Sequence, residues 1–252
     1  MNRKQRRTVE AQARQGKAPG TGGAAESPTL WLRIYNAEAA TAARILEPGV
    51  TPETVAETMD NAINFAMGFT DERTPVACSA GCYYCCHQKV GTTALEMVHL
   101  ATEIRARYSP EVQAEFVEGL RKVVEQRGPE DSTPVRCNFL DEKDACRIYE
   151  IRPLACRSVT STTSEPCRAW LEDGMATGKV ADRRRYHGAQ ATMHGLDKGA
   201  TALGYEGGYI DFHGALHHAL SGEKVVADWY EGKRVFSAKT IPPRMRRLPV
   251  IG

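Results

Sequence analysis

Eight cysteines constrain this chain more than any other feature of its sequence. All of them fall in one third of the chain, and the stretch "CSAGCYYCCHQKV" places four within nine positions. They are Cys78, Cys82, Cys85, Cys86, Cys137, Cys146, Cys156 and Cys167. Cysteines buried as small hydrophobic residues would be scattered, and a disulfide framework suits secreted chains that cannot build a core. A chain of 252 residues can build one, so the clustering favours metal ligands.

Thiolates repel one another, and a bound cation both removes their protons and holds them together. If residues 78–87 are helical, the four sulfurs of the first run share one face, within an arc of about 100°. Two adjacent cysteines fit poorly around one tetrahedral ion, so the later cysteines are expected to contribute. Each of those four stands next to an arginine that could lower its pKa and offset negative charge. These arginines are Arg136, Arg147, Arg157 and Arg168.

The two runs resemble the YkgJ-type cysteine-cluster family, which is described as a zinc- or iron-chelating domain. The resemblance covers about residues 75–170 and includes Cys78-x3-Cys82-x2-Cys85-Cys86, Ile148-Tyr149-Glu150 and Arg152-Pro153-x-x-Cys156-Arg157. It implies that all eight cysteines are metal ligands. Some relatives are similar to flagellin lysine methylases, so the resemblance leaves an enzyme open.

The metal stays open between zinc, iron and an iron–sulfur cluster, because closed thiolate sites suit all three. The main functional hypothesis is a metal-binding protein. Alternatives are a metal- or iron–sulfur-dependent transferase or redox enzyme, and an interaction module with a purely structural metal. The spacing of Cys78, Cys82 and Cys85, with Tyr84 before the last, also matches the signature of radical S-adenosylmethionine enzymes. Those enzymes use an α/β barrel, whose strands the sequence does not predict.

Several histidines are weaker candidates. His87 follows the first run and is expected to support the site or face solvent. His213 and His217 are spaced i, i+4, and His187 and His194 share one face of the preceding helix. With Asp211 nearby they could form a second metal site, but packed or exposed helical histidines are the simpler interpretation.

The rest of the sequence predicts a mainly α protein with an irregular cysteine-bearing segment and at most one short β-hairpin. Helices are expected from Thr29 to a Pro-Gly stop, and over 52–68, 94–108, 110–128, 166–170, 181–202 and 209–221. Thr93 and Glu96 form a capping-box pattern. The hairpin is expected beyond Cys137, with Asp141, Glu142 and Asp144 in a solvated turn. The three tryptophans, Trp31, Trp170 and Trp229, are interpreted as core anchors.

Charge divides the chain into a basic tail and linker at 1–28, one helical domain at 29–235 and a basic tail at 236–252. Residues 1–17 carry six Lys/Arg and one Glu, and 233–252 carry six Lys/Arg and no acid. Such tails could contact nucleic acid or an acidic partner weakly. The sequence has no apolar run of the ~20 residues that a membrane helix needs and no secretory signal. A cytoplasmic protein without a membrane partner is therefore expected.

Overall fold

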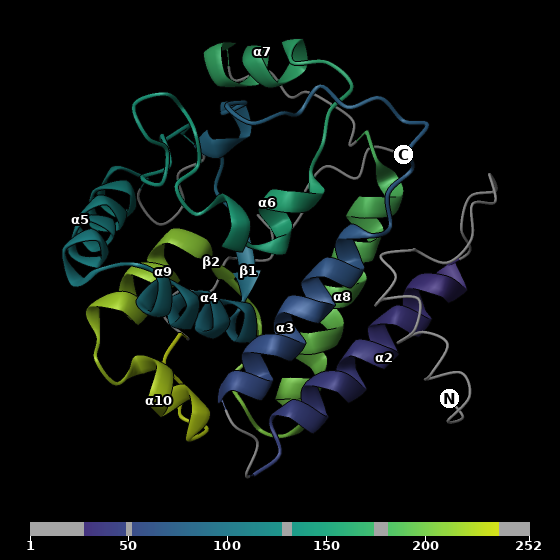
Figure 1. Cartoon of the computed structure of the whole chain (residues 1–252), viewed down its shortest axis with the longest axis vertical. Coiled ribbons are helices and arrows are strands. Elements are labelled where there is room, and N and C mark those ends of the chain that lie inside the picture. The colour runs from purple at the N-terminus through teal and green to yellow at the C-terminus, as the bar shows by residue number, and fades with distance from the viewer. Residues whose placement is uncertain (1–27, 49–51, 128–132, 174–180, 237–252) are drawn as a thin grey trace.

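The computed structural model describes residues 28–48, 52–127, 133–173 and 181–236. Within these ranges the protein is mainly α with one two-stranded sheet, which confirms the predicted fold class (Figure 1). The helices are α2 (Pro28–Ile45), α3 (Pro52–Met67), η1 (Tyr84–His87), α4 (Ala94–Arg107), α5 (Pro110–Arg127), η2 (Tyr149–Ile151), α6 (Leu154–Ser158), α7 (Glu165–Asp173), α8 (Arg183–Ala202), α9 (Phe212–Ser221) and α10 (Val225–Tyr230). The strands are β1 (Gly91–Thr93) and β2 (Tyr209–Asp211). Nearly all of both predicted tails lies outside the described residues.

Helix α8 packs along α2, and glycines set the distance between them. A Cβ atom on Gly195 would lie 2.4 Å from the carbonyl oxygen of Tyr35, and one on Gly199 would lie 2.1 Å from that of Ala39. Asp182 caps the start of α8 by accepting a hydrogen bond from Arg185 N at 3.0 Å. Its second oxygen accepts from Asp71 N at 3.1 Å, which ties the segment leading to the first cysteines to this helix.

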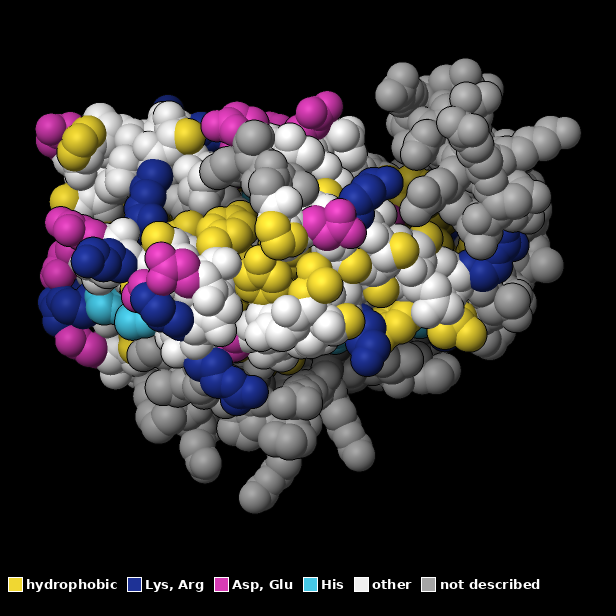
Figure 2. All heavy atoms as spheres, turned by 90° about the horizontal axis from the view of Figure 1, so that it is seen from below, with side chains coloured by type: hydrophobic (Ala, Val, Ile, Leu, Met, Phe, Trp, Pro, Cys, Tyr) yellow, Lys and Arg dark blue, Asp and Glu magenta, His cyan; other side chains and the backbone are white. Residues whose placement is uncertain are grey.

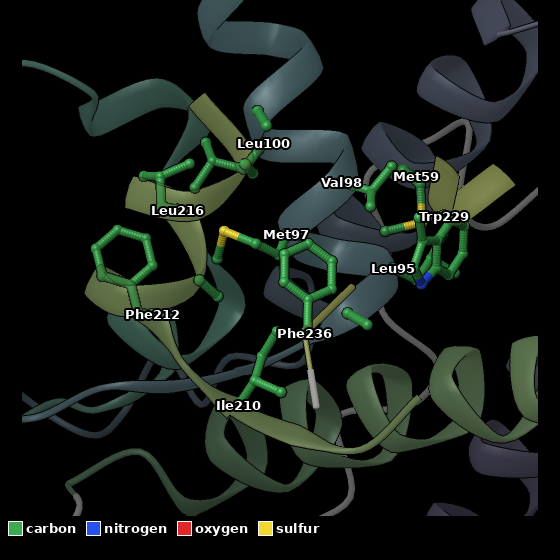
Figure 3. Close-up of a cluster of buried hydrophobic side chains, with 14 of the residues drawn as sticks. Met59, Leu95, Met97, Val98, Leu100, Ile210, Phe212, Leu216, Trp229 and Phe236 are labelled. Carbon is green, nitrogen blue, oxygen red and sulfur yellow. The ribbon is translucent and has the colours of Figure 1, made fainter. Parts of the chain in front are cut away.

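The main core forms where α4 meets α9 and α10. Figure 3 shows Met97 of α4 between Phe212 of α9 and Phe236 at the end of the described chain. Trp229 is fully buried there, as predicted, whereas Trp31 and Trp170 are only half-buried. Phe236 is also fully buried, so the core extends one residue beyond the predicted end of the domain.

The sheet joins segments that the sequence did not link. β1 and β2 pair antiparallel, with Gly91 opposite Asp211 and Thr93 opposite Tyr209. The predicted hairpin is reduced to a turn closed by the single bridge between Leu140 and Cys146. Asp141 holds that turn by accepting hydrogen bonds from the backbone N–H groups of residues 143 and 145. The acidic residues therefore occupy a turn, as expected.

A pocket of about 310 Å³ lies where α2, α8 and α10 end, at the foot of the molecule in Figure 1. Its walls include Leu46, Leu203, Tyr205 and Tyr230. Figure 2 looks at the molecule from this side and shows hydrophobic side chains gathered on the face. The cysteine segments lie at the other end of the molecule, near α7.

The close contact of α2 and α8 predicts the effect of replacing Gly199 by alanine. The added methyl group would meet a backbone oxygen, which cannot rotate away, so overpacking should cost about 1–3 kcal/mol. Alanine's higher helix propensity recovers at most ~1 kcal/mol of this. The free energy of unfolding, measured with denaturant, should therefore fall for Gly199→Ala. The control Lys198→Ala, at an exposed position of the same helix, should unfold like the wild type. A Gly199→Ala protein as stable as the control would contradict this packing.

Candidate metal centre

The first cysteine run is mostly irregular rather than helical. Only residues 84–87 form a helix, a single 3₁₀ turn that carries Cys85 and Cys86. Cys82 N donates to Ser79 O at 3.1 Å in the preceding turn, and Gly81 has a φ of +84° there. That left-handed conformation suits glycine and interrupts a helix. The expectation that one helix aligns all four sulfurs is therefore wrong for Cys78 and Cys82.

Backbone hydrogen bonds join the two cysteine runs directly. Cys137 N donates to Cys86 O at 2.9 Å, and Val135 N donates to His87 O at 3.1 Å. At the other end of the first run, Ala77 N donates to Ser161 O at 2.8 Å. Helix α7, which carries Cys167, packs against η1, as the top of Figure 1 shows. The two runs, far apart in sequence, therefore lie side by side.

Cys85 lies at the centre of the thiol cluster. Its thiol forms a hydrogen bond with that of Cys86, which together with burial raises the pKa of Cys85 well above its ordinary value. Burial is the main cause of a raised pKa at four further cysteines, and repulsion from Cys85 adds to it at each: Cys82, Cys146, Cys156 and Cys167. One sulfur therefore interacts with cysteines from both runs.

The remaining two cysteines are held near the cluster by specific contacts. Ser161 N donates to Cys78 Sγ at 3.4 Å, and Cys78 also raises the pKa of Cys82. Burial raises the pKa of Cys137 to about 11, and the neighbouring thiol of Cys146 adds to this effect. All eight cysteines are free thiols. The structure therefore gathers them in one region without disulfides.

The thiols converge but do not form a finished coordination shell. Across the described residues, which include every cysteine, no three Cys, His, Asp or Glu side chains are close enough to hold one ion. The chemistry of the donor set nevertheless fits a soft-ligand metal such as zinc or iron. Burial and mutual repulsion raise the pKa of most of these thiols, and a bound cation is what would favour their thiolate form. Ligation would require the side chains to rotate toward a common ion.

The arginines that act on the thiols are mostly not the ones predicted. Of the four neighbouring arginines, only Arg136 lowers the pKa of a cysteine. That cysteine is Cys137, and burial and other groups change its pKa more than Arg136 does. The others are engaged elsewhere: Arg147 with Glu115, Arg157 with the carbonyl oxygens of residues 150 and 152, and Arg168 with Glu172. Sequence adjacency failed here because consecutive side chains point in different directions, in the helices α6 and α7 as well as in irregular backbone.

Arg152 is a cation that acts on three thiols of the cluster. Its guanidinium group lies over the ring of Tyr149, 3.7 Å from the centroid. It lowers the pKa of Cys85, Cys146 and Cys156 against the larger effects of burial and neighbouring thiols. The sequence signal for Arg152 is its place in the motif Arg152-Pro153-x-x-Cys156, although Arg152 is not adjacent to a cysteine.

Among the described residues, the histidines do not form the second metal site that the sequence suggested. His187 lies against Trp31, and His194 against Tyr209. Asp211 caps α9 by accepting a hydrogen bond from Gly214 N at 2.7 Å. His213 instead faces the cysteine cluster, with Nε2 3.4 Å from Cys137 Sγ. Burial and the charge of Arg127 lower its pKa to about 3, so the imidazole is neutral.

Glu96 fixes the helix that carries Cys156. Although Thr93 precedes α4, its side chain makes no capping hydrogen bond. The buried Glu96 carboxylate accepts from Thr92 Oγ1 at 2.5 Å and from Leu154 N, at the start of α6, at 2.6 Å. Pro153 precedes α6 and offers no side-chain acceptor, so Glu96 satisfies this N–H group from another helix. The predicted capping box of Thr93 and Glu96 is therefore wrong, because Glu96 binds Thr92 and Leu154 instead.

Replacing Glu96 by alanine should loosen α6 and the cysteine it carries. Leu154 N and Thr92 Oγ1 would both lose their buried acceptor, at a cost of about 1–3 kcal/mol in the free energy of unfolding. Hydrogen exchange at the Leu154 amide should also accelerate. Glu96→Gln is the matched control, because its amide can still accept from Leu154 N and contact Thr92. Unchanged stability and exchange in Glu96→Ala would contradict this role.

The comparisons with known proteins concern the same segment. Residues 77–176 match the model of the CxxCxxCC family, whose description is "Putative zinc- or iron-chelating domain". Neither a curated protein nor a solved structure matches the chain. Among the described residues, no helix has the length and apolar character needed to cross a membrane. The match confirms the resemblance to a cysteine-cluster family and supports zinc or iron binding by residues 77–176.

Proposed function

We propose that this protein chelates zinc or iron through the thiolates of its two cysteine runs. The proposed ligands are Cys78, Cys82, Cys85, Cys86, Cys137, Cys146, Cys156 and Cys167. The observation that carries the proposal is that backbone hydrogen bonds, such as that from Cys137 N to Cys86 O at 2.9 Å, hold the two runs together, while all eight thiols are free. Free thiols in such proximity are the donor set that soft-ligand metal sites require.

The cluster contains more sulfur than one tetrahedral ion can use. Four thiolates complete a zinc site or hold an iron–sulfur cluster. Eight could therefore hold two four-thiolate sites, a shared multinuclear zinc cluster, or one four-iron cluster with spare cysteines. The adjacency of Cys85 and Cys86 in one 3₁₀ turn supports a shared or multinuclear arrangement, because neighbouring residues would then belong to one centre.

A transferase or redox enzyme, the second function considered, would need room for a substrate beside the thiols. The 310 Å³ pocket described above is lined by residues at the ends of α2, α8 and α10 instead. It therefore lends this function no support. Binding of an acidic partner or nucleic acid by the tails stays a prediction, because the tails lie outside the described residues.

Metal content of the protein purified without oxygen tests the proposal. We expect at least one zinc or iron per chain, with zinc giving a colourless protein and an iron–sulfur cluster a brown one. Cys85→Ser should lower the metal-to-protein ratio, because it removes the central thiol. Ser79→Ala, an exposed position between two cysteines of the first run, is the matched control and should keep the wild-type ratio.

Two results would count against the proposal. One is a wild-type protein that binds neither metal after reduction and loading with each. The other is a Cys85→Ser protein that folds like the wild type and retains the same metal-to-protein ratio and absorption spectrum, which would exclude Cys85 from the centre.

A further inference from the structure

We propose that His213 is a positioning residue that donates a hydrogen bond from Nε2–H to the metal-bound sulfur of Cys137. This inference rests on the proposed function. It goes beyond it because His213 lies on α9, outside the segment that matches the chelating family. It gives the C-terminal half of the chain a direct part in the metal centre.

The partners of the His213 ring determine which nitrogen carries the proton. Arg127 Nη1 lies 3.1 Å from His213 Nδ1, and a guanidinium group can only donate hydrogen bonds. Nδ1 must therefore be the acceptor and carry no proton. In a neutral imidazole the proton then resides on Nε2. Because Nε2 lies 3.4 Å from Cys137 Sγ, its N–H group donates to sulfur.

The same assignment argues against His213 as a metal ligand. To bind an ion through Nε2, the ring would have to move its proton to Nδ1, where it would oppose the N–H group of Arg127. Nδ1 is already occupied by that donor. The arrangement instead resembles a ligand with an outer hydrogen-bond partner, in which the partner sets the orientation and electron density of the ligand.

Arg127, which donates to the His213 ring, is itself buried and held by hydrogen bonds. It is 3 % exposed, and its Nη2 donates to Val135 O at 3.0 Å and to His87 O at 3.2 Å. Those two carbonyl groups belong to the two cysteine runs, at the point where backbone hydrogen bonds join them. The buried guanidinium thus holds both runs and polarises the imidazole that faces Cys137. Its positive charge offsets part of the negative charge that a thiolate centre would carry.

Cobalt(II) provides a probe, because its thiolate charge-transfer absorption reports the electron density on the sulfur ligands. In His213→Phe, loss of the N–H donor should leave Cys137 more electron-rich and move this band to longer wavelength. The affinity for cobalt should fall by about 10-fold, the lower end for loss of an outer-shell partner. The metal-to-protein ratio at saturation should not change, because every cysteine remains.

Two further variants separate the hydrogen bond from packing. His213→Gln retains an amide N–H group for Cys137 and an oxygen for Arg127, so its band and affinity should stay close to the wild type. His218→Phe removes a histidine from the same helix, where it contacts Phe236, and should leave the spectrum unchanged. A His213→Phe protein with the wild-type band and affinity would overturn the inference. So would a His213→Gln protein that binds cobalt as weakly as His213→Phe.

Nitrogen NMR of the zinc-loaded wild type tests the same point even if His213→Phe fails to fold. We expect His213 with a protonated Nε2 and a bare Nδ1. A proton on Nδ1 with Nε2 bound to zinc would make His213 a ligand and refute the donor role. A wild-type protein that binds neither zinc nor iron would instead refute the proposed function itself, and this inference with it.

Discussion

The hydrogen bond from Cys137 N to Cys86 O is the contact on which the candidate metal centre depends, since it joins two runs that are far apart in sequence. Next to it, Val135 N binds His87 O, and the buried Arg127 donates to the carbonyl groups of both residues. Backbone groups and one guanidinium group therefore hold the two runs together through contacts that do not involve the thiols. The thiols themselves oppose this arrangement whenever they ionise, because like charges in a buried site repel. A bound cation would reverse that repulsion, which gives the metal a structural as well as a chemical part.

Helices inside and outside the matched segment supply the frame that holds the runs in place. Helix α4 contributes Glu96, which satisfies the first amide of α6 and so fixes Cys156. Helix α9 contributes His213, and α5 ends with Arg127. These three side chains come from separate elements around one core, and each reaches a cysteine run through a hydrogen bond. The chelating segment is therefore integrated into the larger helical domain.

The sequence predicted the helices well because their signals are local. Helical periodicity and proline at the first turn place α3 and α5 within a residue or two of their observed bounds. The cluster itself was expected from the number and spacing of its cysteines. What failed were inferences about side-chain direction. Arg147 and Arg157 stand beside cysteines in sequence yet bind elsewhere, and Gly81 interrupts the helix that would have aligned the first run.

Other features could not be predicted because they depend on contacts between distant segments. The strands β1 and β2 are three residues each, too short for an alternating pattern, and their paired residues, such as Gly91 and Asp211, lie far apart in the sequence. In the sequence, His213 stands out only through its i, i+4 spacing from His217, and this spacing suggested a separate metal site. Its actual partners, Arg127 and Cys137, are set by how α9 packs against α5. Likewise, Glu96 resembles a local capping residue and instead serves another helix.

X-ray absorption at the edge of the bound metal tests the central claim most directly, because it identifies the atoms that surround the ion. If thiolates from both runs converge on the metal, zinc-loaded protein should show a shell of sulfur atoms at about 2.3 Å. Serine substitution in either run, at Cys85 or at Cys156, should reduce that shell. A spectrum dominated by nitrogen or oxygen neighbours, or a sulfur shell unaffected by substitutions in one run, would contradict the account.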